Sequence, residues 1–519
     1  MSITRNSAVL RFLLAFFGAW GAAGPTSGIG RALDGIGNFF RRQSGESALC
    51  AFVWREGRIP RAWPHSLACG LFTGLVNIPC AAAKWLYQSL RRLWDGSVCF
   101  QLFAAMGGAS YFFLGLLMLV MLVAPHGMWN NIYGFAGAAG VLCLFVVGSA
   151  TRPKLRLELD RLGPYMIFYM GFICISLAAS LSTRMSMRFF FFHLTGFLLV
   201  LVLVSSVRKY EQLQLVVSLA VLGVSAAALY GCYQGYVGVD VIASQQDMYV
   251  NAGMPGRVYS FFDNPNNFAE QLVMLLPLDL ALFLNCRWRG KILSLLSLAM
   301  GAAAIGFTYS RSGWIGLALA VVVFLALMDW RFVPVFLLLG VAAIPFLPET
   351  IYNRILSIGN AHDTSTRYRF EIFDTTTNLM RDYWVRGVGL GTDIMKKTFE
   401  TYPTIFDGTY PVHTHNNYLQ MWGETGIWGI ISFLALLLWQ LKTGAKALFS
   451  TADKRIKRLL AASIGAFCGI LVIGIAEYTW FYPRNMFTWW FLFGIITACV
   501  KLARPDSFSC KKKNQKELP

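Results

Sequence analysis

The chain has 519 residues, of which 56% are hydrophobic, 15% aromatic and only 14% charged, and its formal net charge is +19. A soluble globular domain carries roughly 25% charged residues, so this composition excludes an ordinary soluble protein and favours a polytopic membrane protein. The positive charge does not indicate nucleic-acid binding, because the basic residues gather in short breaks between long apolar runs, as membrane topology requires.

Residues 1–97 are predicted to form a basic extension. They are rich in Arg, Trp and Gly, as in NFFRRQSG, WREGRIPRAWPH and SLRRLWDG. We expect an amphipathic segment that is cytoplasmic or interfacial, with its arginines at anionic lipid headgroups. The first residues also resemble a signal peptide, since basic residues precede a short apolar core, and a cleaved signal is the alternative.

Residues 98–502 are predicted to form an all-α domain with about twelve membrane spans. A helix needs about 20 apolar residues to cross the hydrocarbon core of a bilayer. Two of the predicted spans are less distinct than the rest, because one follows its neighbour after a very tight turn and the next is separated from it only by DWR. The apolar runs begin near residues 100, 129, 163, 188, 211, 260, 291, 311, 330, 414, 457 and 483.

The short loops predict the orientation of these spans. TRPKLRLELDR, VRKYEQ, CRWRGK, KTGAKALFSTADKRIKR and the basic tail 503–519 all fall on one side. By the positive-inside rule this side is cytoplasmic, and so are both termini. The opposite face carries the segment 348–412, between spans nine and ten, with the helical pattern STRYRFEIFDTTTNLMRD. Because connections longer than about 15 residues are usually functional or disordered, we expect a helical extracytoplasmic lid.

Arginines on this outer face are the first candidate site residues, because the positive-inside rule disfavours them there. Arg311 lies in the break GFTYSRSGWIGLALA, where an unpaired buried guanidinium is costly. Guanidinium groups present a fork of donors that suits phosphate oxygens, so several together would form a diphosphate site without a metal. The alternative is that each arginine reaches lipid headgroups or pairs with an acid such as Asp263 or Glu424. The candidates are Arg184, Arg188, Arg257, Arg311, Arg367, Arg369, Arg386 and Arg484.

Two polar motifs precede apolar spans. In GRVYSFFDNPNNFAEQ, Asn264 and Asn266 either cap the following helix or rim a cavity and bind sugar hydroxyls. In PVHTHNNYLQ, a neutral histidine is a suitable general base for a sugar hydroxyl, while the asparagines hold the acceptor or cap the next helix. No HExxH or Cys pair accompanies these histidines, so we expect no metal. The residues of this second motif are His413, His415, Asn416 and Asn417.

The ordered blocks NPNNFA, SRSGW, RYRFEIF…RGVGLG and HTHNNYLQMWGETGIWG resemble the O-antigen ligase and O-antigen polymerase superfamily over roughly residues 160–500. The resemblance implies a GT-C-like membrane glycosyltransferase of the bacterial cytoplasmic membrane. Such an enzyme moves a glycan from a polyprenyl (undecaprenyl) diphosphate carrier to a hydroxyl of a glycan or lipid acceptor, on the outer face. No metal, nucleotide sugar or other cofactor is implied, and the chain's partners would be the donor, the acceptor and the lipid bilayer.

By this resemblance His415 activates the acceptor, Arg311 and Arg369 hold the diphosphate, and RGVGLGT forms a tight turn at Gly387, Gly389 and Gly391. The chain departs from the family pattern where Phe373 replaces a common tryptophan and where Arg386 replaces an apolar residue, and the 97-residue extension lies outside the pattern. The substrate-binding residues that we expect are Arg257, Asn264, Asn266, Arg367, Arg386, His413, Asn416 and Asn417.

Two other functions fit the same topology. An exporter or flippase of lipid-linked sugars would use intramembrane acids, of which Asp279, Glu270 and Glu477 are the plausible ones. A peptidoglycan glycosyltransferase of the shape-elongation type would use an aspartate of the long loop. The candidates for that base are Asp363, Asp374 and Asp393. Ligase and polymerase share the same donor chemistry, so the sequence leaves both open.

Overall fold

The structure is a computed structural model that describes residues 28–47, 51, 54–241, 255–356, 364–402 and 410–505. Every regular element in these ranges is helical, which confirms the all-α prediction. The chain divides into two compact units, Met1–Arg58 and Ile59–Pro519. The first contributes α3 (Gly28–Glu46). The predicted boundaries at residues 97 and 502 stay predictions.

Nine helices of the described residues are long and apolar enough to cross a membrane, and two bent helix pairs raise the number to eleven if each is one span. The chain is therefore a polytopic membrane protein, whereas the predicted number of twelve stays a prediction. The nine helices are α11 (Asn131–Ala150), α13 (Thr183–Ser206), α14 (Tyr210–Val237), α15 (Pro265–Asn285), α16 (Trp288–Phe307), α17 (Arg311–Asp329), α22 (Asn417–Ser450), α23 (Lys454–Ala476) and α24 (Pro483–Ala503).

Three of the predicted spans have another form. The one near residue 100 is the pair α9 (Val98–Gly108) and α10 (Ser110–Val123), bent by 74°. The spans near 163 and 330 are shorter helices, α12 (Pro164–Ala178), which has 15 residues, and α18 (Phe332–Ala343), which has 12. A turn of 3-10 helix, η5 (Ile344–Phe346), extends α18.

A second bent pair precedes these spans and consists of α6 (Leu67–Val76) and α7 (Ile78–Ser89), at 52°. Asn77 joins the two helices and binds Leu157 twice: its Nδ2 donates to the Leu157 carbonyl, and its Oδ1 accepts from the Leu157 N–H, both at 2.8 Å. These bonds attach the pair to the loop before α12. The short elements nearby are α5 (Arg58–Ala62), η1 (Trp63–His65), α8 (Arg91–Asp95), η2 (His126–Met128) and η3 (Leu159–Leu162).

The core of the second unit is formed by α13, α15, α23 and α24, whose side chains are the most buried of the long helices. Trp480, Trp489 and Trp490 are among its largest fully buried side chains. Asn266 at the start of α15 and Asn417 at the start of α22 both bind the turn between α23 and α24. One end of the bundle therefore gathers the starts of α15, α22 and α24 and the end of α23.

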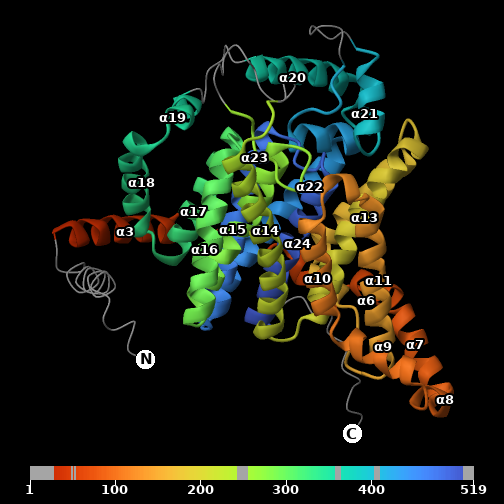
Figure 1. The fold of residues 1–519 in the computed structure, drawn as a ribbon. Helices are drawn as coiled ribbons and strands as arrows, with labels where there is room; N and C mark the ends of the chain where they lie inside the picture. Colours follow the sequence, from red (N-terminus) through yellow and green to blue (C-terminus); the bar gives the residue numbers. More distant parts are fainter. Residues whose placement is uncertain are drawn as a thin grey trace. The chain divides into compact units, whose positions relative to one another are not determined.

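The segment after α18 folds as predicted into further helices, α19 (Glu349–Leu356), α20 (Thr364–Tyr383) and α21 (Thr392–Phe399). The pattern STRYRFEIFDTTTNLMRD lies entirely within α20. In Figure 1, α20 crosses the end of the bundle at which α22 begins. Residues from α20, α21 and the turn between them form a small separate core, which consists of Leu379, Met380, Val388, Ile394, Met395 and Phe399.

Candidate active site at one end of the helix bundle

Glu477, the residue that follows α23, brings three distant segments together. Its Oε1 accepts hydrogen bonds from Nη2 of Arg369 on α20 at 2.5 Å and from Nδ2 of Asn266 on α15 at 3.2 Å. Its Oε2 lies 3.5 Å from Nδ1 of His415, just before α22. A single carboxylate therefore links three predicted site residues.

The charges around Glu477 keep it ionised. Burial by itself would raise the pKa of this carboxyl group, but the positive charge of Arg369 and the bond with His415 act in the other direction. They prevail, and the pKa of Glu477 falls to about 2. The carboxylate is consequently negative at neutral pH and can hold both a guanidinium and an imidazole.

Arg257 is a second buried charge of this site and lies in the loop before α15, with 8% of its surface exposed. Its Nε donates to the Thr308 carbonyl at 2.8 Å, and its Nη2 donates to Oδ1 of Asn266 at 2.6 Å. Asn266 therefore bridges Arg257 and Glu477. The role of Asn266 in sugar binding stays a prediction.

The charges of three further guanidinium groups act on Arg257. Burial is the main cause that lowers the pKa of Arg257, to about 9, and the charges of Arg354, Arg311 and Arg369 add to this effect. Glu477 opposes it. A cluster of positive charge of this kind favours an anionic ligand.

The tight break between α16 and α17 positions Arg311. Tyr309 in this break takes φ of +49°, and Oγ of Ser310 accepts the Gly313 N–H as the N-cap of α17. Arg311 is thus the first residue of a 19-residue helix, where the helix dipole adds positive potential. Arg354 on α19 approaches the same break, with its Nε 3.4 Å from the Tyr309 carbonyl oxygen.

The two histidines have different roles in the turn before α22. His415 has φ of +49°, which is uncommon for any residue except glycine, and its backbone N–H donates to Nδ1 of His413 at 3.2 Å. Burial and the neighbouring His415 lower the pKa of His413 to about 3, so His413 is neutral. The ring centroids of His413 and His415 are 4.2 Å apart, and the ring centroid of Phe481 lies 4.6 Å from that of His413. His413 therefore supports the strained backbone of His415.

Three of the predicted asparagines are engaged in capping and bridging. Oδ1 of Asn416 accepts the N–H groups of the first turn of α22, and Oδ1 of Asn264 accepts the Asn266 N–H at 2.8 Å. Asn417 forms two bonds of 2.8 Å with Thr479. The capping interpretation of both motifs accounts for these contacts, and a role in sugar binding stays a prediction.

The remaining arginines lie in other surroundings. Arg367 is exposed and pairs with Glu371 at 3.2 Å, and Arg386 is exposed and stands over the ring of Tyr383 at 5.5 Å. Both partners lie on α20. Arg484 is fully buried and donates to Tyr482 and to the carbonyl oxygens of Met121, Ala124 and Phe261, so it joins α24 to neighbouring segments.

The glycine turn after α20 attaches this helix to α22. Gly387, Gly389 and Gly391 have φ of +71°, +116° and +91°, as the expected tight backbone requires. The Gly389 N–H donates to the Glu424 carbonyl at 3.2 Å, and a Cβ on Gly389 would lie 2.0 Å from Oγ of Ser180. Glycine is thus required at this position, where the segment that carries Arg369 meets the helix that follows His415.

The sequence pointed only weakly to two residues of this site. Glu477 was considered solely as an intramembrane acid of an exporter, although it ends an apolar span and precedes the aromatic run YTWFYPR. Arg354 was not singled out in IYNRIL. No group of three or more His, Cys, Asp or Glu side chains that could hold a metal occurs within the ranges that the structure covers.

The chain is similar in sequence to known proteins. Residues 292–434 match the family model described as O-Antigen ligase, and this range includes Arg311, Arg369 and His415. The chain is also 28% identical over 223 residues to the "Putative polysaccharide ligase" of Rickettsia typhi, across 41% of this chain and 51% of the relative. The chain thus spans about half the length of that relative. The chain is thus similar to the O-antigen ligase family over residues 292–434.

Proposed function

We propose that this protein is a membrane glycosyltransferase that moves a glycan from a polyprenyl diphosphate carrier to an acceptor hydroxyl during surface polysaccharide assembly. The observation that carries the proposal is the contact of Arg369 and His415 with the Glu477 carboxylate, beside the buried Arg257, on which the charges of Arg311, Arg354 and Arg369 act. The match of residues 292–434 to the O-antigen ligase family model and the name of the Rickettsia relative support the same reaction class.

The arginines form the donor side of the proposed site. Nε of Arg369 is buried and has no hydrogen-bond partner among the described residues, so it can donate to a phosphate oxygen of the carrier. Arg257, on which the charges of Arg369, Arg311 and Arg354 act, adds positive charge to this side. As the glycan leaves, negative charge develops on the diphosphate, and its stabilisation by fixed cations is the largest contribution to the rate in this proposal.

His415 forms the acceptor side. When Nδ1 donates its proton toward Glu477, Nε2 carries the lone pair and can act as a base. The acceptor O–H proton passes to Nε2 as the oxygen bonds to the anomeric carbon. The bond from that carbon to the phosphate oxygen breaks, and the diphosphate leaves with the electron pair. Attack opposite the leaving group inverts the anomeric configuration.

The arginines also supply the charge that a divalent metal would otherwise provide, so we propose a metal-independent reaction. Addition of EDTA to the purified protein is expected to leave the transfer rate unchanged. A loss of transfer with EDTA, restored by Mg²⁺ or Zn²⁺, would contradict this part of the proposal.

We further propose that the site opens on the outer face of the bacterial cytoplasmic membrane and that both termini are cytoplasmic, in line with the basic short loops. A cysteine introduced at Thr377, which is exposed on α20, should react with an impermeant maleimide added to spheroplasts. A cysteine at Lys454, which is exposed at the start of α23, should react only after lysis. The reverse pattern would exclude this orientation.

The reaction is tested with the full chain in proteoliposomes that contain a polyprenyl diphosphate-linked glycan and an acceptor glycolipid. We expect transfer by the wild type and its loss in His415→Ala and Arg311→Lys. Near-normal transfer by both variants would contradict the mechanism. Transport of the lipid-linked glycan across the membrane without any glycan transfer would favour the exporter alternative. In a knockout, accumulated lipid-linked polymer indicates a ligase, and accumulated single repeats indicate a polymerase.

A further inference from the structure

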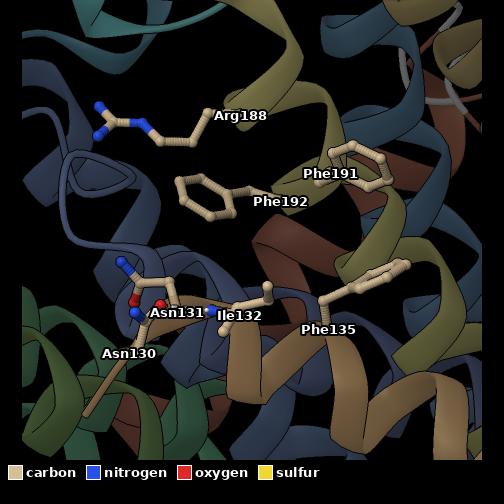
Figure 2. A pocket seen from close by; sticks show the side chains of 7 residues that line it. All are labelled: Asn130, Asn131, Ile132, Phe135, Arg188, Phe191 and Phe192. Atoms are coloured by element: carbon tan, nitrogen blue, oxygen red, sulfur yellow. Dashed lines mark hydrogen bonds between the residues drawn. The ribbon is translucent and has the colours of Figure 1, made fainter.

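A pocket separate from the residues of the candidate active site opens between α11 and α13. Its volume is about 370 Å³, within the range of roughly 300–1,000 Å³ that is typical of small-molecule sites. Figure 2 shows Arg188, Asn130 and Asn131 along one side of this pocket and the rings of Phe135 and Phe191 along the other. Ile132 and Phe192 complete the lining. One side is thus polar and cationic, and the other is apolar.

The surroundings place the pocket near the boundary between hydrocarbon and water. Its residues lie near the starts of two candidate membrane spans: Asn130 caps α11, which begins at Asn131, and the lining residues of α13 fall within the first ten residues of that helix, which begins at Thr183. Trp129 lies beside it, with its Nε1 donating to Oδ1 of Asn131 at 3.1 Å, and packs edge-on against Tyr133. Trp and Tyr concentrate at the headgroup level of membranes.

Arg188 is the charged group of the pocket. Its Nη2 donates to Oδ1 of Asp393 on α21 at 2.7 Å, with 56% and 42% of the two side chains exposed. An exposed ion pair of this kind is weak, so a second anion can compete with Asp393 for the guanidinium. A phosphate suits the fork of donors at least as well as a carboxylate does.

We propose that this pocket binds an anionic phospholipid of the surrounding bilayer, with the lipid phosphate at Arg188 and the upper part of one acyl chain against the rings of Phe135 and Phe191. The two rings meet edge-on at 5.2 Å and Phe191 is 40% exposed, so an acyl chain reaches them from the membrane. The phosphate and Asp393 then compete for one guanidinium. Lipid binding at α13 consequently loosens the contact with α21.

This competition makes two substitutions distinguishable. Arg188→Gln and Asp393→Asn both abolish the ion pair, but only the first also removes the proposed phosphate ligand. We test them on the full chain in detergent by native mass spectrometry, with phosphatidylglycerol as the anionic probe and phosphatidylcholine as the zwitterionic one. Arg188→Gln should weaken phosphatidylglycerol binding roughly tenfold, as the loss of a charged hydrogen bond predicts, whereas Asp393→Asn should strengthen it.

Equal effects of the two variants would overturn the proposal, because they would reflect only the lost ion pair. The exposed pair of Arg455 and Glu211, 2.9 Å apart, supplies the control. If Arg455→Gln weakens phosphatidylglycerol binding as strongly as Arg188→Gln does, the selectivity is a general effect of surface charge and the site is refuted. None of these outcomes depends on glycan transfer, so the proposed function can fail or succeed independently.

A photoreactive phosphatidylglycerol with a diazirine in the upper acyl chain locates the lipid directly. Adducts should concentrate on the peptides that contain Phe135 and Phe191–Phe192, and Arg188→Gln should reduce them. Adducts spread evenly over the other membrane helices would exclude a defined site. This readout also covers the case in which a variant folds poorly, since the wild-type map alone is decisive.

Discussion

The His415 imidazole faces the Glu477 carboxylate, with 3.5 Å between Nδ1 of His415 and Oε2 of Glu477. His415 lies just before the start of α22, and Glu477 lies just after the end of α23. Because these two consecutive helices run antiparallel, the start of α22 and the end of α23 meet at the same end of the bundle. The same carboxylate binds Arg369. Glu477 thus connects the proposed base with the proposed donor site, and several measurable consequences depend on this connection.

Glu477→Gln is expected to lower kcat by about 100-fold with a smaller change in KM. A neutral amide can neither hold His415 in the form that acts as a base nor neutralise the charge of Arg369. The measurement is initial-rate transfer in proteoliposomes at several donor concentrations. Glu400→Gln, an exposed acid after α21, is the matched control and should behave as the wild type. A Glu477→Gln protein with unchanged kcat would show that His415 needs no carboxylate partner.

Arg369→Lys is expected to lower turnover by about 10²–10³-fold, the range seen when one donor to a developing negative charge is removed. Lysine keeps the positive charge but lacks the guanidinium fork. In arginine, Nη2 of this fork binds Glu477, while Nε stays available for the diphosphate of the glycan donor. The control is Arg381→Lys, an exposed position on the same helix. If both lysine variants retain full turnover, a guanidinium at residue 369 is unnecessary for the reaction.

Gly389→Ala is expected to destabilise the protein by on the order of 3 kcal/mol, because φ of +116° is unfavourable for alanine and its Cβ would meet Oγ of Ser180 at 2.0 Å. The thermal midpoint of the detergent-solubilised protein measures this effect. Gly340→Ala, in α18 and with open space around it, should leave the midpoint unchanged or raise it slightly. Equal midpoints for the two variants would mean that the turn tolerates a side chain.

The lowered pKa of Glu477 predicts how stability depends on pH. A carboxyl group with a folded-state pKa of about 2 and an ordinary unfolded value contributes on the order of 3 kcal/mol at neutral pH. This contribution is fully present above the unfolded pKa and is lost as the pH falls toward the folded pKa. The stability difference between wild type and Glu477→Gln should therefore be constant from pH 8 to 6 and shrink below about pH 4.5.

Thermal unfolding of both proteins across this pH range checks the prediction. A difference that is already lost between pH 7 and 6 would indicate that a group with a higher pKa, and not Glu477, carries the pH dependence. Denaturation midpoints of Glu400→Gln over the same range control for the general effect of protonating exposed acids, because Glu400 lies on the surface.

Much of the architecture follows from local sequence. Apolar runs of about 20 residues separated by short basic breaks are sufficient to predict a polytopic helical protein, because the bilayer requires each span to satisfy its own backbone hydrogen bonds. The helix α20 followed from its pattern, whereas the glycine turn at Gly387–Gly391 was implied by the family resemblance. The apolar runs near residues 163 and 330 gave shorter helices than expected, since hydrophobicity sets neither where a helix ends nor whether it bends.

The sequence alone singled out Arg311, Arg369 and His415 as chemically unusual residues, but it could not say which groups they contact. Tertiary structure decided that Glu477 joins Arg369, Asn266 and His415, and that Arg257 and Arg354 add to the positive charge. It also separated the capping asparagines from the bridging Asn266. The physical reason is that propensity and hydropathy act over neighbouring residues, whereas an ionic site depends on which helix ends the packing of the bundle brings within a few ångströms.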